Sequence, residues 1–257
     1  MTTTPSHVTA TREDRVLHLV LDRPAKKNAL TRAMYMALAD ALAAAADDPA
    51  VAVVTLSGSG DAFTAGNDLA DFASSGGDVS EVMRFLFALV DFPKPVLAAV
   101  HGAAVGIGTT LLLHCDLAWA APSARFRTPF VELGLVPEAA SSYLMPRQFG
   151  AARAARLLLL CETIDAVEAA DWGLVAGVVA EDALHATVRE KARALAAKAP
   201  EAVRASKALL RAPTREPVLA VMRREGDLFK ARLTSPEARE AMMAFLQKRP
   251  PNFAPGA

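Results

Sequence analysis

The stretch PVLAAVHGAAVGIGTTLLLHCDLAWAA, residues 95–121, decides the class of fold. It begins with a buried strand over 95–100, passes through a glycine-rich loop into an apolar helix over 106–115, and returns to a strand over 116–121. Apolar strands that alternate with helices in this way are typical of α/β proteins. We therefore expect this stretch to lie within an α/β core.

The alternation continues on both sides of this stretch. Upstream, strands are predicted over 15–24 and 51–60, where a proline and a Gly/Ser turn end them. A helix is predicted between these strands over 31–48, with Thr31 as its N-cap. Downstream, a further strand is predicted over 124–130, so strands and helices alternate through the first two thirds of the chain.

The last third of the sequence has a different character. Beyond about residue 137, Ala-rich helical sequence dominates, with one strand signal over 174–180. The segments 211–217 and 233–240 contain proline, and they are expected to be turns between helices rather than domain boundaries. The residues themselves therefore predict an α/β fold with a helical C-terminal extension.

The charge balance gives no sign of a nucleic-acid or membrane partner. Lys plus Arg and Asp plus Glu both number 28, so the formal net charge is zero, and 53% of the residues are hydrophobic. A zero net charge leaves no basic field to attract nucleic acid or an anionic membrane. The longest apolar runs are interrupted by His, Asp and Gly, so a membrane span is not expected.

The two cysteines indicate a reducing compartment. Cys115 and Cys161 stand in apolar runs, and neither has a CxxC partner or a clustered histidine. This pattern predicts buried, reduced thiols, which fits the cytoplasm. Neither end of the sequence shows a secretion signal or a peroxisomal address, so a cytoplasmic protein is expected.

Two glycine-containing loops, 58–72 and 101–116, are the first functional candidates. Each could be an ordinary strand-to-helix turn, or could aim free backbone N–H groups at a ligand. Leu111 stands where a dinucleotide fingerprint needs its third glycine, and no Gly-Lys-Ser/Thr follows, so nucleotide phosphates are disfavoured. Two converging N–H donors would instead suit an oxyanion formed from a carbonyl or a thioester.

An apolar segment, FRTPFVELGLVPEAASSYLMPRQFG at 126–150, contains just two carboxylates, Glu132 and Glu138. A carboxylate buried among apolar residues is costly unless it is paired or takes part in chemistry. Close to two N–H donors, such a group could abstract a proton. Pro137-Glu138 is also typical of a helix N-terminus, so the residues alone leave both interpretations open.

Three motifs in a fixed order carry a resemblance to a known family. AFTAGNDL at 62–69, HGAAVGIGTTLLLHCDL at 101–117 and ARFRTPFVELGLVPE at 124–138 resemble the crotonase, or enoyl-CoA hydratase/isomerase, superfamily. The resemblance extends from VLHLVLDRPAKKNAL near the start to AMMAFLQKRPPNF in the tail. Within the superfamily, the motifs are most similar to the Δ3,Δ2-enoyl-CoA isomerase branch.

The resemblance implies a fold and an assembly. The expected fold is an α/β, crotonase-like ββα superhelix with a helical C-terminal extension. The spiral core is expected over 1–195, and a C-terminal helical trimerisation region over 196–257. A homotrimer or a dimer of trimers is expected, with a pocket for an acyl-CoA thioester.

The resemblance also assigns roles to particular residues. The oxyanion donors fall on the backbone N–H groups of Asn67 and Ile107, which do not depend on the side chains at those positions. Hydratases of the superfamily use two glutamates, and Thr110 and Phe130 stand at those positions here, which argues against an ordinary hydratase. The isomerase branch places one acid at Glu138, which becomes the expected catalytic base.

The remaining candidates have smaller roles. Glu132 is expected to be structural or to lie at the rim of the site, and His101 and His114 are expected to be structural. No metal or redox cofactor is expected, because coenzyme A is part of the substrate. The residues expected to contact the acyl-CoA are Lys26, Ala65, Gly66, Asn67, Asp68, Leu69, Gly106 and Ile107.

The favoured reaction is a shift of the double bond from 3-enoyl-CoA to 2-enoyl-CoA. Three alternatives stay open: a hydratase-like enzyme, a ring-forming or ring-opening isomerase of aromatic-acid breakdown, and an acyl-CoA-binding protein without catalysis. The acyl chain length depends on how residues 74–92 fold over the pocket, which the sequence does not give.

Overall fold

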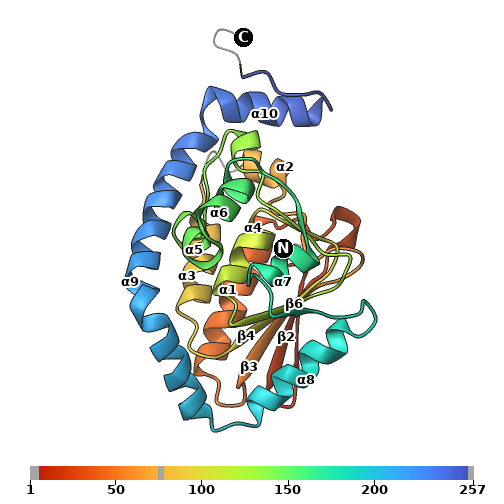
Figure 1. The fold of residues 1–257 in the computed structure, drawn as a ribbon, viewed down its shortest axis with the longest axis vertical. Helices are drawn as coiled ribbons and strands as arrows, with labels where there is room; N and C mark the ends of the chain where they lie inside the picture. The colour runs from red at the N-terminus through yellow and green to blue at the C-terminus, as the bar shows by residue number, and fades with distance from the viewer. Residues whose placement is uncertain (1–5, 75–77, 254–257) are drawn as a thin grey trace, which may run out of the picture.

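The structure, a computed structural model, describes residues 6–74 and 78–253 (Figure 1). Its main sheet has six strands in the order β1-β2-β3-β4-β6-β9, all parallel except β1. These strands are β1 (Val8–Glu13), β2 (Val16–Leu21), β3 (Val53–Gly58), β4 (Val96–Val100), β6 (Leu117–Ala120) and β9 (Gly177–Val178).

A smaller second sheet runs beside the ends of the first. Its three strands lie in the order β5-β7-β8, and they are β5 (Ala103–Val105), β7 (Arg125–Arg127) and β8 (Ile164–Asp165). Two isolated parallel bridges extend this second layer toward the N-terminus, one between Leu30 and Asn67 and one between Thr64 and Ala104. Successive turns of the chain therefore pair with each other in both layers.

The helices complete each turn of the spiral. Their bounds are α1 (Arg32–Asp47), α2 (Leu69–Ser74), α3 (Ser80–Val90), α4 (Ile107–Thr110), α5 (Ser141–Phe149), α6 (Ala151–Leu158), α7 (Ala166–Asp171), α8 (Leu184–Ala196), α9 (Pro200–Leu233) and α10 (Pro236–Leu246). Three 3-10 helices are η1 (Pro24–Lys26), η2 (Leu111–His114) and η3 (Val131–Leu133).

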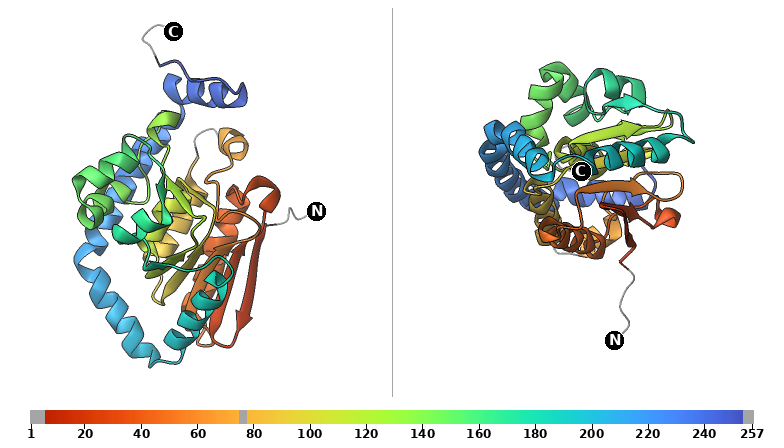
Figure 2. Two further views of the ribbon diagram at one scale, coloured as in Figure 1. Left: turned by 45° about the vertical axis from the view of Figure 1, so that its right-hand side comes forward. Right: turned by 90° about the horizontal axis from the view of Figure 1, so that it is seen from below.

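One pattern repeats along the chain. A strand of the main sheet is followed by a strand or bridge of the second sheet and then by a helix, as in β4, β5 and α4. The turn of β2, the bridge at Leu30 and α1 has the same form. The predicted ββα superhelix is confirmed, and so is the helical C-terminal extension, which Figure 2 shows wrapped along one side of the spiral.

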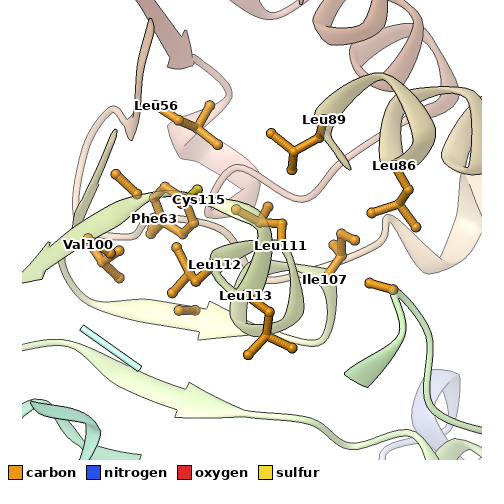
Figure 3. Packing of buried hydrophobic residues seen from close by; sticks show 14 of the residues in the cluster. Leu56, Phe63, Leu86, Leu89, Val100, Ile107, Leu111, Leu112, Leu113 and Cys115 are labelled. Carbon is orange, nitrogen blue, oxygen red and sulfur yellow. The ribbon is translucent and has the colours of Figure 1, made fainter. Parts of the chain in front are cut away.

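The main sheet separates two hydrophobic clusters. On one face, Val53 and Leu97 pack with Leu184 and Val188 of α8. The opposite face belongs to the larger core, which α1, α3, α4 and α9 also line, and Figure 3 shows part of this core around η2. Since strand side chains alternate between the two faces, this arrangement explains why the sequence of β4 is apolar throughout.

Helix α9 contradicts one sequence prediction. The segment 211–217 is not a turn, because α9 continues through Pro213 and Pro217 as one helix of 34 residues. Proline removes only a single N–H and crowds one carbonyl, so packing on both sides can offset its cost. On the N-terminal side Lys207 and Arg211 bind Asp116, and on the C-terminal side α9 buries an apolar face in the core.

The other predicted boundaries lie closer to the ends of the observed helices and strands. Thr31 caps α1, because its hydroxyl oxygen accepts a hydrogen bond from the Met34 N–H at 3.3 Å. The turn within 233–240 separates α9 from α10, as expected. The predicted helix over 106–115 begins at Ile107 but tightens into η2 after Thr110. Strand β1 was not predicted.

Some sequence expectations fall outside what the structure describes. Residues 75–77, within the segment expected to shape the acyl pocket, and the terminal residues 1–5 and 254–257 are not among the described residues. The boundary expected between 195 and 196 falls at the end of α8, and the division into a core and a trimerisation region stays a prediction. Within 6–74 and 78–253, none of the helices carries an apolar run long enough to cross a membrane.

Candidate active site

The two glycine loops lie against each other. The Thr64 N–H donates to the Ala103 carbonyl at 2.9 Å, and the Val105 N–H donates to the Thr64 carbonyl at 3.0 Å. At Gly66, whose φ is +90°, a Cβ atom would lie 2.9 Å from the Val105 carbonyl oxygen. Glycine is therefore required at 66 for both its backbone conformation and this close approach.

The Asn67 N–H is free to bind a ligand. The Leu30 strand bridge uses the groups on either side of it, since Leu30 N–H donates to Gly66 at 2.8 Å and Asp68 N–H donates to Leu30 at 2.9 Å. The intervening N–H of Asn67 donates to no other group in the described parts of the chain. In a parallel bridge this group points away from the partner strand, so it is available to an oxyanion.

The Ile107 N–H is the corresponding group in the second loop. Ile107 is the first residue of α4, after Gly106 with φ +56°, and the N–H groups of Thr109 and Thr110 both donate to the Gly106 carbonyl. The Ile107 N–H donates to no acceptor among the described residues. Its side chain is buried in the core, as Figure 3 shows, so the first turn of α4 is anchored.

Tyr35 adds a contact that sequence reasoning missed. Its hydroxyl donates a hydrogen bond to the side-chain oxygen of Asn67, and its ring is fully buried. Burial raises the pKa of Tyr35 well above its usual value, and the charge of Glu138 raises it further, so the phenol is neutral. The Asn67 side chain therefore joins the first loop to α1, and this contact gives it a structural role.

This contact refines what should follow when Asn67 is replaced. Asn67→Ala removes the bond from Tyr35 but leaves the backbone N–H in place, so we expect acyl-CoA turnover to stay within about tenfold of the wild type. The loss of one neutral hydrogen bond should cost stability of about 1 kcal/mol. Steady-state kinetics and thermal unfolding of the variant measure both effects, and a loss of turnover beyond about 100-fold would assign the chemistry to the side chain.

Glu138 is a buried acid close to Thr110 of α4. Its side chain is buried, at 6% exposure, and its Oε1 has no hydrogen-bond partner in the described parts of the chain. Burial raises the pKa of Glu138 to about 8, the negative charge of Glu225 adds to the rise, and the Thr110 hydroxyl opposes it. A carboxyl group with these properties is suited to take up and return a proton.

The backbone after Glu138 has an unusual conformation. Ala139 and Ala140 both have positive φ, at +58° and +54°, which costs free energy in residues that carry a Cβ. His114 holds this turn, because its Nε2–H donates to the Ala139 carbonyl at 2.7 Å. Burial lowers the pKa of His114 to about 4, so the ring is neutral and its role is structural.

Thr110 and Phe130 stand at the positions to which the resemblance assigns the two hydratase glutamates. Both are buried, and neither side chain can activate water as a base. The Thr110 hydroxyl has no hydrogen-bond partner of its own among the described residues, although it is close enough to act on Glu138. Glu138 thus has an unpaired hydroxyl beside it rather than a second carboxylate from α4.

Glu132 has a different environment. Both of its carboxylate oxygens accept hydrogen bonds from the Arg127 guanidinium, at 2.8 and 2.7 Å, and the side chain is about half exposed. The charge of an exposed, paired carboxylate is balanced by its partner and solvated by water. The structure therefore places Glu132 in a surface ion pair and separates it from the buried Glu138.

The CoA-contacting candidates lie around the first loop. Lys26 is exposed at the end of η1, and the neighbouring Lys27 accepts the Ala65 N–H at its carbonyl, at 2.8 Å, which joins this turn to the loop. Asp68 is occupied, because Arg23 donates to it at 2.6 Å. Burial would raise the pKa of Asp68, but the bonds from Arg23 and from the first amides of α2 lower it overall. Leu69 begins α2.

Comparison with known proteins shows the family to which the chain belongs. The family model described as enoyl-CoA hydratase/isomerase matches residues 11–255. The chain belongs to the enoyl-CoA hydratase/isomerase family.

Individual relatives span both activities of that family. Enoyl-CoA delta isomerase 2 of Rattus norvegicus is 38% identical over 95% of this chain, which spans 64% of that protein's length. The 2,3-dehydroadipyl-CoA hydratase of Escherichia coli is 36% identical over 96% of this chain and 98% of its own. The crystal structure of an enoyl-CoA hydratase/isomerase from Pseudoalteromonas atlantica matches with a TM-score of 0.92 and 46% identity, over 96% of this chain and 100% of that one.

Proposed function

We propose that this enzyme is a Δ3,Δ2-enoyl-CoA isomerase that uses Glu138 as its single base. The observation that carries the proposal is the buried Glu138 carboxyl, whose Oε1 has no hydrogen-bond partner among the described residues, together with the free N–H groups of Asn67 and Ile107. Two further observations support it: the charge of Glu138 acts on Tyr35, whose hydroxyl holds the Asn67 side chain, and the Thr110 hydroxyl of α4 acts on Glu138.

The reaction follows from these groups. The thioester oxygen of a 3-enoyl-CoA accepts hydrogen bonds from the N–H groups of Asn67 and Ile107, which stabilise negative charge on that oxygen. Glu138 takes a proton from C2, so a dienolate forms, and the same carboxyl returns the proton at C4. The double bond moves from C3–C4 to C2–C3, and one base with two backbone donors suffices for this shift, so it requires neither a metal nor a redox cofactor.

The relatives support a reaction of this family, but they do not separate isomerisation from hydration. The delta isomerase from rat favours the double-bond shift, and the hydratase from Escherichia coli shows that a related chain adds water. What separates the two reactions in this chain is the pair Thr110 and Phe130, which leaves one base where a hydratase uses two carboxylates. The proposed CoA contacts are Lys26 and the backbone of the first loop.

The proposal extends to the assembly and the compartment. Apolar side chains such as Leu209, Leu210, Leu159 and Leu160 are more than 60% exposed, and burial of such residues stabilises a subunit interface. A homotrimer or a dimer of trimers would cover them, which size-exclusion chromatography with light scattering can measure. Cys115 and Cys161 are both free and buried, as a cytoplasmic protein would have them.

The proposed reaction is tested by comparing two rates on the purified protein. We expect a short 3-enoyl-CoA to be converted to the conjugated 2-enoyl-CoA, and crotonyl-CoA to be hydrated at least about 100-fold more slowly, because one base with no second carboxylate activates water poorly. The two reactions have opposite effects on the absorbance of the conjugated thioester, so one spectrophotometer measures both. A hydration rate comparable with the isomerisation rate would contradict the single-base mechanism.

A further inference from the structure

A second buried glutamate reaches the turn that follows Glu138. Glu225 comes from α9 and is 5% exposed. Its Oε2 accepts a hydrogen bond from the Ala140 N–H at 2.6 Å. Its Oε1 accepts one from the Ser142 N–H at 3.0 Å and another from the Ser142 hydroxyl. Neither the reaction nor the fold described above requires a carboxylate at this place.

We propose that Glu225 is a positioning residue for the catalytic base, which holds the Glu138 turn through α9 and keeps a fixed negative charge facing Glu138. The inference rests on the proposed function in that it names Glu138 as the base. It differs from that function in giving a role to a residue of α9, 85 residues further along the chain than Ala140.

The hydrogen bonds indicate which of the two acids carries the charge. All three donors at Glu225 are N–H or O–H groups, and they stabilise an ionised carboxylate. Burial raises the pKa of Glu225 above its usual value, and the bonds from Ser142 and Ala140, with the nearby Arg224, offset part of that rise. Glu138 has no such donor at Oε1 and is the member of the pair that takes up the proton.

The other groups around Glu138 are neutral near pH 7. Tyr35 from α1 has a pKa raised well above its usual value, and His114 from η2 has a pKa lowered to about 4. Thr110 from α4 does not titrate. The charge of Glu225 is therefore the ionic interaction that most affects the proton affinity of Glu138. A full second role as a hydratase acid is disfavoured, because both oxygens of Glu225 already accept hydrogen bonds.

The geometry of the turn explains why a residue of α9 would position Glu138. The Ala139-Ala140 turn is costly by itself, and it is held from two sides, by His114 at the Ala139 carbonyl and by Glu225 at the Ala140 N–H. Since these bonds act on the residues next to Glu138, they fix the direction of its carboxyl. Small displacements of a catalytic group are costly for rate, so the position of α9 becomes part of the site.

The test is Glu225→Gln, which keeps the size of the side chain and removes its charge. Loss of a neighbouring negative charge lowers the pKa of a carboxylic acid, so the midpoint at which kcat/KM rises with pH should fall by at least about one unit. The maximal kcat should fall by about tenfold, because the amide group cannot accept from all three donors. A residue that only stabilises the fold would lower activity without moving this midpoint.

A direct titration separates this proposal from the proposed function. With glutamate carrying ¹³C at the carboxyl carbon, the Glu138 signal is identified by its absence in Glu138→Gln. We expect its titration midpoint to fall in Glu225→Gln and to stay unchanged in Glu216→Gln, an exposed acid on the same helix. An unchanged midpoint in Glu225→Gln would overturn the proposal. Absent isomerisation in the wild type, together with a shifted midpoint, would reject the isomerase and leave the charge interaction intact.

A second variant covers the case in which Glu225→Gln does not fold. Glu225→Asp keeps the charge but withdraws the carboxylate by one methylene from Ala140 and Ser142. We expect the Glu138 midpoint to stay within about half a unit of the wild type, while kcat falls at least about tenfold and KM stays within about threefold. Wild-type kcat in this variant would show that the contacts with the turn do not position the base.

Discussion

Replacing Glu138 with glutamine should lower isomerisation by at least about 100-fold while acyl-CoA binding persists. Glutamine has nearly the same size and polarity, but it cannot accept a proton from C2. Because burial raises the pKa of Glu138 to about 8, the side chain is largely protonated near pH 7, so a neutral amide of the same size should not weaken the fold. Steady-state kinetics give the rate, and calorimetry with a non-reactive acyl-CoA gives the affinity.

Glu132→Gln is the matched control for this prediction. It makes the same chemical change six residues upstream, where the carboxylate lies in an exposed ion pair with Arg127. Such pairs contribute about 1 kcal/mol or less to stability, so turnover and unfolding should both stay close to the wild type. If both variants fold and Glu132→Gln is the one that loses activity, the catalytic acid has been assigned to the wrong position.

The parts of the site that the sequence predicted are those with a local pattern. Gly66 and Gly106 each precede the residue whose N–H group is free, and each has a positive φ that a short glycine motif encodes. Glu138 follows a proline in a segment with few other charges. These features depend on neighbours in the chain, so they are visible without a structure, and their order along the chain was sufficient to identify the family.

Glu225 and Tyr35 were missed because their partners are far away in the sequence. A weak signal exists for Glu225, since it stands at helical spacing in the buried face of α9 with Val218, Met222 and Phe229. An acid within such an apolar face needs a partner, but the sequence does not say which one.

The strongest test of the oxyanion hole is Gly66→Ala, for which we expect turnover to fall by about 100-fold to 1000-fold. A Cβ at this position would lie 2.9 Å from the Val105 carbonyl oxygen, a backbone atom that cannot rotate away, so the first loop must move away from β5. The Asn67 N–H moves with it and loses its alignment with the thioester oxygen. The change should appear mainly in kcat, since the negative charge develops in the transition state.

Gly173→Ala separates this displacement from the general cost of a positive φ. Gly173 has φ +79°, close to the +90° of Gly66, but a Cβ there meets nothing within 4 Å. Both variants should lose about 1 kcal/mol of stability from the backbone conformation, and only Gly66→Ala should lose turnover. If Gly66→Ala keeps its rate while Asn67→Ala loses it, the stabilising group in the first loop is the Asn67 side chain that Tyr35 holds, and the backbone N–H has no part in binding the oxyanion.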